Sequence, residues 1–154
     1  MTEDQTDNAE IERLEPLIGE WHLGIEFPGA DPIPPGPSAR VTFEWQEGGR
    51  FIVQRWTAPD PAPNGIAIIG WNAERGTHLQ HYFDSRGVAR VYEMSFADGR
   101  WELRREREDF SPLNFNQRFE GELSEDGKTI AGRWDIDEGQ GWRLDFHLTY
   151  RRVS

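Results

Sequence analysis

The stretch that decides the fold is YEMSFADGRWEL, residues 92–103. Large apolar residues alternate with charged or small ones on both sides of Asp98-Gly99, which is the period of a β-strand. Because Asp-Gly favours a tight two-residue turn, the two halves predict a β-hairpin. Such a turn fixes the register, so Phe96 is expected to pair with Trp101 on one apolar face.

The same alternation extends in both directions, from Trp21 to Tyr150. We expect strands at about residues 21–27, 41–45, 50–56, 66–71, 78–84, 88–96, 100–108, 114–123, 129–137 and 142–152. Short turns force neighbouring strands to be antiparallel, and a meander of this length forms a closed barrel or a sandwich. The uniform up-and-down order favours an all-β protein with a single antiparallel β-barrel of about ten strands.

A short helix is expected in front of the barrel. Asn8 can cap a helix that reaches about Leu17, with Gly19 as its stop. Residues 1–8 are polar and acidic, and they are predicted to form a disordered tail. Residues 9–154 then form one domain, which agrees with the usual size of a single domain.

Composition restricts the function. The chain has 154 residues, a formal net charge of −11 and no cysteine. An acidic surface disfavours nucleic acid and anionic membranes as partners, and the lack of cysteine excludes disulfides and thiolate metal sites. The acidic start does not resemble a signal peptide, so the chain is expected in the cytoplasm. The abundance of arginine over lysine suggests a bacterial gene.

The expected hairpin registers also place polar residues inside the barrel. The predicted ligand-binding residues on the inner face are His81, Arg90, Tyr92, Arg105 and Gln117. Buried charges need a partner, so these arginines indicate a site for an anionic group near the open end. The turn at residues 48–49 can shift by one residue, which leaves open whether Gln54 or Arg55 faces the cavity.

Two sequence features resemble a known superfamily. Gly19-Glu20-Trp21, on the first strand after a short helix, resembles the Gly-x-Trp signature of calycins, the superfamily of lipocalins and fatty-acid-binding proteins. This resemblance implies that an arginine near the C-terminus packs on Trp21, with Arg152 preferred over Arg151. The stretches GGRFIVQRW (48–56), HYFDSRGV (81–88) and DGKTIAGRW (126–134) look like a bacterial calycin-like family of unknown function.

The sequence therefore predicts that the barrel binds a small hydrophobic or amphipathic molecule with an anionic or polar end. Two alternatives stay open at this point. His81 and Tyr92 could form an acid–base pair in a small barrel enzyme of the isomerase, cyclase or hydrolase type. His81 could also hold a haem. No resident cofactor and no metal site are predicted, and the sequence does not indicate an oligomeric state.

Overall fold

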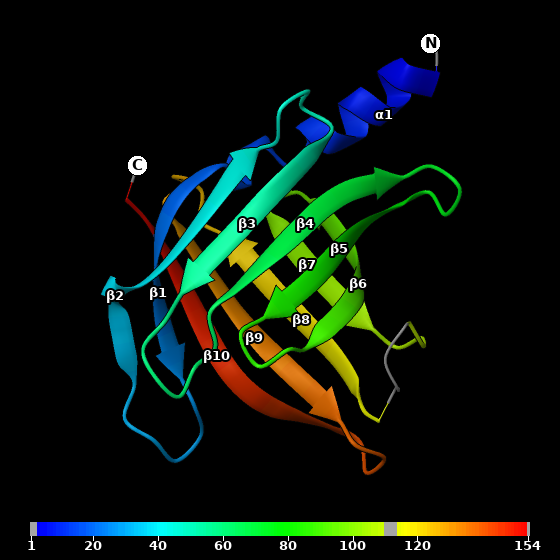
Figure 1. The fold of residues 1–154 in the computed structure, drawn as a ribbon. Coiled ribbons are helices and arrows are strands. Elements are labelled where there is room, and N and C mark those ends of the chain that lie inside the picture. Colours follow the sequence, from blue (N-terminus) through cyan, green and yellow to red (C-terminus); the bar gives the residue numbers. More distant parts are fainter. Residues whose placement is uncertain (1–2, 110–113, 154) are drawn as a thin grey trace.

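The computed structural model describes residues 3–109 and 114–153. It confirms the predicted architecture: ten antiparallel strands form one closed barrel, in which each strand pairs with its neighbours in sequence and β1 pairs with β10 (Figure 1). The strands are β1 (Gly19–Glu26), β2 (Ile33–Trp45), β3 (Phe51–Thr57), β4 (Gly65–Asn72), β5 (Thr77–Asp84), β6 (Ala89–Ala97), β7 (Arg100–Arg105), β8 (Asn116–Leu123), β9 (Thr129–Asp137) and β10 (Trp142–Arg152).

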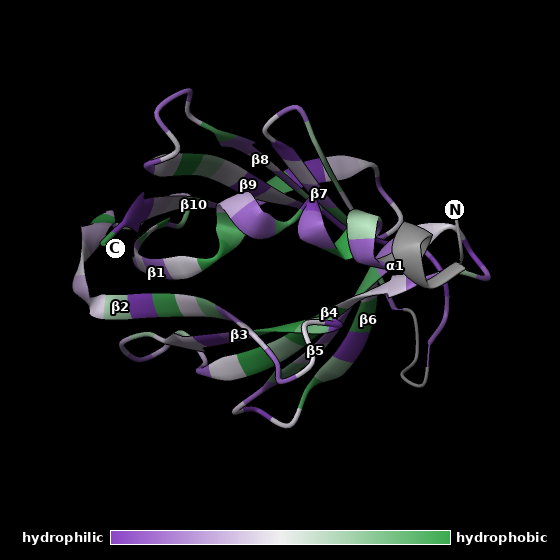
Figure 2. Ribbon diagram, turned by 90° about the horizontal axis from the view of Figure 1, so that it is seen from above, coloured by the Kyte–Doolittle hydropathy of each residue, from purple (hydrophilic) through white to green (hydrophobic). Residues whose placement is uncertain are grey.

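One end of the barrel, here called the floor, is covered by helical turns. The helix α1 (Glu3–Glu12) begins earlier than the predicted cap Asn8, and a 3-10 turn (Glu15–Leu17) follows it. Seen from this end, the helical segments cross over the ring of strands (Figure 2). Ile11, Leu14 and Leu17 are buried in the core, so the helical segment closes the floor with apolar side chains.

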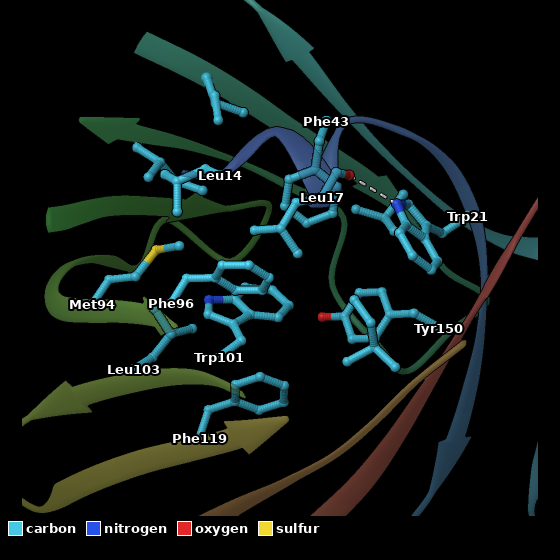
Figure 3. Close-up of a cluster of buried hydrophobic side chains, with 14 of the residues drawn as sticks. Leu14, Leu17, Trp21, Phe43, Met94, Phe96, Trp101, Leu103, Phe119 and Tyr150 are labelled. Atoms are coloured by element: carbon cyan, nitrogen blue, oxygen red, sulfur yellow. Dashed lines mark hydrogen bonds between the residues drawn. The ribbon is translucent and has the colours of Figure 1, made fainter. Parts of the chain in front are cut away.

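The core beneath these turns is aromatic. Trp101 meets Phe43, Phe119 and Tyr150 at ring-centre distances of 5.9, 4.8 and 5.7 Å (Figure 3). Glycine makes room for this cluster, because a Cβ atom on Gly132 would lie 2.5 Å from the Phe119 ring. The floor half of the barrel is therefore filled with side chains.

The opposite end, here called the mouth, carries the connections that follow β1, β3, β5, β7 and β9. The first of these is shorter than expected, because β2 begins at Ile33 and includes prolines that the sequence placed in a loop. This part of β2 pairs with β1 only, since pairing with β3 is confined to Arg40–Trp45. Proline is tolerated there because one side of the segment needs no hydrogen-bond donor.

Neither helix in the part of the chain that the structure describes is long and apolar enough to cross a membrane.

Candidate functional site

A cavity of about 430 Å³ lies inside the barrel, between the filled floor and the mouth. This size falls in the ordinary range for sites that bind small molecules. Aromatic residues dominate its lining, from Tyr150 and Trp101 near the floor to Phe27 and Phe115 near the mouth. The barrel therefore encloses a largely aromatic space.

The aromatic side chains of one wall hold one another in place. Trp56 stacks on Tyr82 with ring centres 5.3 Å apart, and Tyr82 meets Tyr92 edge-on at 5.9 Å. The Trp56 indole N–H donates to the carbonyl of Pro63 at 3.1 Å. Its ring lies directly on Gly65, where a Cβ atom would come within 2.1 Å of the indole. Trp56 is thus fixed at the entrance by a hydrogen bond, a stacked ring and a glycine.

The opposite wall is mainly apolar, and the Asp145 carboxyl of β10 is its charged group. It consists of residues from β1, β9 and β10, whose cavity-lining side chains include Leu23, Ile25, Trp134, Phe146 and Leu148. Trp134 and Phe146 lie roughly parallel at 6.5 Å, and Phe146 contacts Phe27 at 5.1 Å. A ligand in this cavity would therefore meet flat hydrocarbon surfaces on this side.

Three of the predicted site residues come together on β6 and β8. The Tyr92 hydroxyl donates to Gln117 Oε1 at 2.9 Å, and Arg90 Nη1 donates to the same oxygen at 3.3 Å. All three residues line the cavity, and the Arg90 guanidinium also lies 5.1 Å from the centre of the Phe115 ring. No carboxylate of the described residues lies within ion-pair distance of Arg90. Its charge therefore faces the cavity without a counter-ion from residues 3–109 and 114–153.

Burial determines the protonation of Tyr92. Burial raises the pKa of its hydroxyl, and the charges of Arg90 and Arg105 oppose this effect only in part. The hydroxyl consequently stays protonated near neutral pH and acts as a hydrogen-bond donor.

Arg105 does not belong to this cluster, which corrects the prediction. It points inward and is 2% exposed, but it does not line the cavity. Its Nε and Nη2 atoms donate to the two Asp109 carboxylate oxygens, each at 3.0 Å. Asp109 Oδ2 also accepts the backbone N–H of Val91 at 2.9 Å. Arg105 is thus part of a bidentate ion pair that ties the chain after β7 to β6.

The prediction that His81 faces inward is wrong. His81 is exposed on the outer face and pairs with Val91, whereas its neighbours Gln80 and Tyr82 line the cavity. The cause is the connection after β5. The inward prediction for His81 assumed a two-residue turn at residues 85–86 or 86–87. In the structure the last pair is Phe83 with Ala89, so an odd number of residues, 84–88, connects the strands. One extra residue moves every side chain of a strand to the other face.

This correction removes the geometric basis of both alternative hypotheses. His81 and Tyr92 lie on opposite faces of the wall, so they cannot act together as an acid–base pair inside the barrel. From the outer face, His81 also cannot reach a haem in the cavity. Within the described ranges, no group of three or more histidines and carboxylates could hold a metal ion.

Several cavity residues were not predicted. The register of β2 and β3 settles the open choice at residues 54–55, since Gln54 is buried and Arg55 is exposed. Gln80 and Tyr82 enter the cavity through the same register change that removes His81. Asp145 enters through an irregularity between Leu144 and Phe146, where β10 has one residue more than β9. Such a bulge turns a side chain to the other face.

A charged group at the mouth fixes Tyr82. The Tyr82 hydroxyl donates to Asp84 Oδ2 at 2.6 Å, and Arg86 Nη2 donates to the same oxygen at 2.6 Å. Burial acts to raise the pKa of Asp84, but the hydrogen bonds from Arg86 and Tyr82 outweigh it and lower this pKa to about 2. The carboxylate is therefore ionised, and Arg86 neutralises its charge. Arg90 differs because no described carboxylate neutralises its charge.

No protein-family model and no curated protein matches this chain. Among solved structures, the crystal structure of Rv2717c from M. tuberculosis is similar, with a TM-score of 0.57 and 16% sequence identity over 94% of this chain and 98% of that chain. The two chains share a fold. At this level of identity the likeness extends no further, so evidence on function comes from the cavity itself.

Proposed function

We propose that this barrel binds a small, largely aromatic molecule with an anionic end, and that Arg90 holds the anion. The observation that carries the proposal is the Arg90 guanidinium, which faces the cavity with no carboxylate of the described residues within ion-pair distance. Hydrogen bonds to charged groups contribute about 1.5–3 kcal/mol each, so a bound carboxylate would be held firmly.

The neighbours of Arg90 support this role. Gln117 Oε1 accepts from Arg90 and from the protonated Tyr92 hydroxyl, and this shared acceptor orients the guanidinium. The aromatic walls supply the surface for the rest of the ligand. A calycin-like relationship is part of the proposal, on the basis of the ten-stranded barrel, Gly19 and the Trp21–Arg152 contact. We keep the cytoplasm as the proposed compartment because the chain lacks cysteine.

The test is calorimetric titration with 1-naphthoate and with 1-acetylnaphthalene, an uncharged compound of similar shape. We expect saturable binding of 1-naphthoate, weaker binding of the ketone, and a loss of at least about tenfold in 1-naphthoate affinity in Arg90→Ala. Ketone affinity should change little in this variant. The matched control is Arg55→Ala, which removes an arginine from the exposed outer face of β3. If neither compound binds, or if Arg90→Ala binds 1-naphthoate as well as the wild type does, the proposal is wrong.

A further inference from the structure

Two buried amides lie side by side in the cavity wall, away from Arg90. Gln54 on β3 and Gln80 on β5 are 6% and 3% exposed, and both line the cavity. Gln80 Nε2 donates to Gln54 Oε1 at 2.9 Å. The strand β4 runs between them: Ala67 is paired with Gln54 and Ile69 with Gln80, so the two amides meet diagonally across β4 beside the small side chain of Ala67.

The single hydrogen bond leaves half of each amide without a protein partner. No residue of the described ranges accepts from Gln54 Nε2 or donates to Gln80 Oε1. Turning both amides over exchanges their roles and leaves the same two kinds of group, one N–H donor and one carbonyl acceptor. Both amides line the cavity, so the free donor and acceptor can take their partners only from what occupies it.

We infer that Gln54 and Gln80 form a second recognition site, which selects ligands that carry an adjacent acceptor and donor, such as a lactam or another cyclic amide. This inference rests on the proposed function and specifies its ligand further. A lactam presents C=O and N–H side by side, which matches the free N–H and the free carbonyl of the two amides. A neutral aromatic hydrocarbon would leave both amides unsatisfied, which costs affinity.

The surroundings fit a flat ring. Trp56 follows Gln54 on the inner face of β3, and Tyr82 follows Gln80 on the inner face of β5, in each case towards the mouth. The Trp56 and Tyr82 rings stack on each other. Ile52 is buried on the floor side of Gln54. Most of the polar side chains of the cavity wall lie between β3 and β8, whereas β1, β9 and β10 supply mainly apolar ones together with Asp145. A ligand with one polar edge and apolar faces would satisfy both walls.

The two polar sites are separated along the wall. Gln54 and Arg90 lie in one row of paired residues that runs through Ala67 and Tyr82, so three strand spacings, roughly 14 Å, separate their backbones. Long side chains from both ends of this row shorten the gap. A two-ring aromatic lactam with a carboxylate across the same ring from the lactam N–H therefore has the right chemistry at both ends.

The test compares 2-oxo-1,2-dihydroquinoline-4-carboxylate with 1-naphthoate, which has the same shape and carboxylate but no lactam. We expect the wild type to bind the lactam at least about tenfold more tightly, because an unsatisfied buried pair discriminates strongly. The double variant Gln54→Leu/Gln80→Leu should bind both compounds with nearly equal affinity, because the lactam loses its partners and 1-naphthoate no longer leaves two amides unsatisfied. Replacing both partners of a hydrogen bond by apolar groups of similar shape is tolerated well.

Control measurements separate the possible failures. Arg90→Ala should weaken both compounds by a similar factor and leave their ratio unchanged. If the double variant does not fold, as judged by circular dichroism, Gln54→Met alone must lower the ratio. Equal affinity of the two compounds for the wild type, or an unchanged ratio in the folded variants, would overturn the amide site and leave the proposed function standing. If neither compound binds, the proposed function fails and the amide site with it.

Discussion

The Arg152 guanidinium lies over the Trp21 ring, with its carbon 4.1 Å from the ring centre, and closes the floor of the barrel. The two residues are directly paired between β1 and β10. Arg152 also donates to the backbone carbonyls of Gly127, Ile18 and Pro16 at 2.9, 2.7 and 2.5 Å. One side chain thus ties together the floor turn, the first strand and the β8–β9 turn.

Arg152→Ala should lower the free energy of unfolding by about 2–3 kcal/mol, because it removes the cation–π contact and leaves three carbonyl groups without their donor. Arg152→Lys should recover only part of this loss, since an ammonium cannot reproduce the planar fork of donors. Chemical denaturation measures both variants. Arg151→Ala is the matched control on the exposed face. Equal stability of Arg152→Ala and Arg151→Ala would show that Arg152 does not close the floor.

Trp21→Ala should be more damaging, at about 3–5 kcal/mol, because it deletes a large aromatic side chain from a closed core. The ring is fully buried, and its indole N–H donates to the carbonyl of Leu17 at 3.0 Å (Figure 3). Trp21→Phe keeps part of the ring volume and loses this hydrogen bond, so its stability should lie between those of the wild type and Trp21→Ala. Thermal unfolding followed by circular dichroism measures the order, and an unchanged melting temperature in Trp21→Ala would contradict it.

The fold could be predicted from the sequence because turns of known length fix the register of their strands. Asp98-Gly99 placed Phe96 opposite Trp101, and the structure confirms this pair. The C-terminal arginine on Trp21 followed from the family resemblance, with Arg152 rightly preferred to Arg151. Local turn chemistry and alternation therefore predict the barrel, whereas the contact that closes its floor was implied by the resemblance.

The site could be predicted only in part, because single extra residues decide which side chains enter the cavity. The longer connection after β5 exchanges His81 for Gln80 and Tyr82, and the irregularity in β10 brings in Asp145. No composition or alternation pattern distinguishes these from regular strands. The Asp109 carboxylate could not be foreseen as the partner of Arg105, because it lies in a loop whose path depends on tertiary contacts.

The Arg105–Asp109 pair should contribute to stability and not to ligand binding. Both side chains are buried, so Asp109→Ala should lower the free energy of unfolding by about 3–5 kcal/mol because it removes the carboxylate that faces the buried Arg105 charge. The double variant Arg105→Met/Asp109→Leu should recover most of this loss. It should also bind 1-naphthoate with wild-type affinity, in contrast to Arg90→Ala. A tenfold loss of binding in the folded double variant would return Arg105 to the ligand site.

His78 should make the fold sensitive to mild acid. Its Nε2 atom lies 2.8 Å from the carbonyl of Glu10, which joins α1 to β5. Burial lowers its pKa below the ordinary value of 6.5, although the hydrogen bond and the charge of Glu10 oppose this, while Arg13 adds to it. The unfolded chain therefore binds the proton more readily, and stability should fall as the pH falls through the unfolded value.

Denaturant unfolding between about pH 7 and about pH 5 measures this dependence. His78→Gln should be less stable than the wild type near neutral pH, and its stability should fall less steeply with acid. His81→Gln, on the exposed outer face of the same strand, is the control and should keep the wild-type slope. Identical slopes in His78→Gln and the wild type would show that another group controls acid sensitivity.

Asp145 should oppose both folding and anion binding near neutral pH. Its carboxyl lines the cavity, and burial raises its pKa, although Arg143 counteracts this effect. A carboxyl with a raised pKa in the fold stabilises the fold when protonated, and this contribution is lost as the pH rises through the folded value. Asp145→Asn should therefore raise the melting temperature at about pH 7 and give no gain below about pH 3, where the wild-type carboxyl is protonated.

The same variant should bind 1-naphthoate about threefold more tightly at low salt, because it removes a like charge from the cavity, and the gain should shrink as salt is added. Asp137→Asn, at the end of the neighbouring strand β9 and outside the cavity lining, is the control for a general loss of negative charge. Weaker binding of 1-naphthoate by Asp145→Asn would mean that Asp145 helps to hold the ligand, and it would reverse the role given to it here.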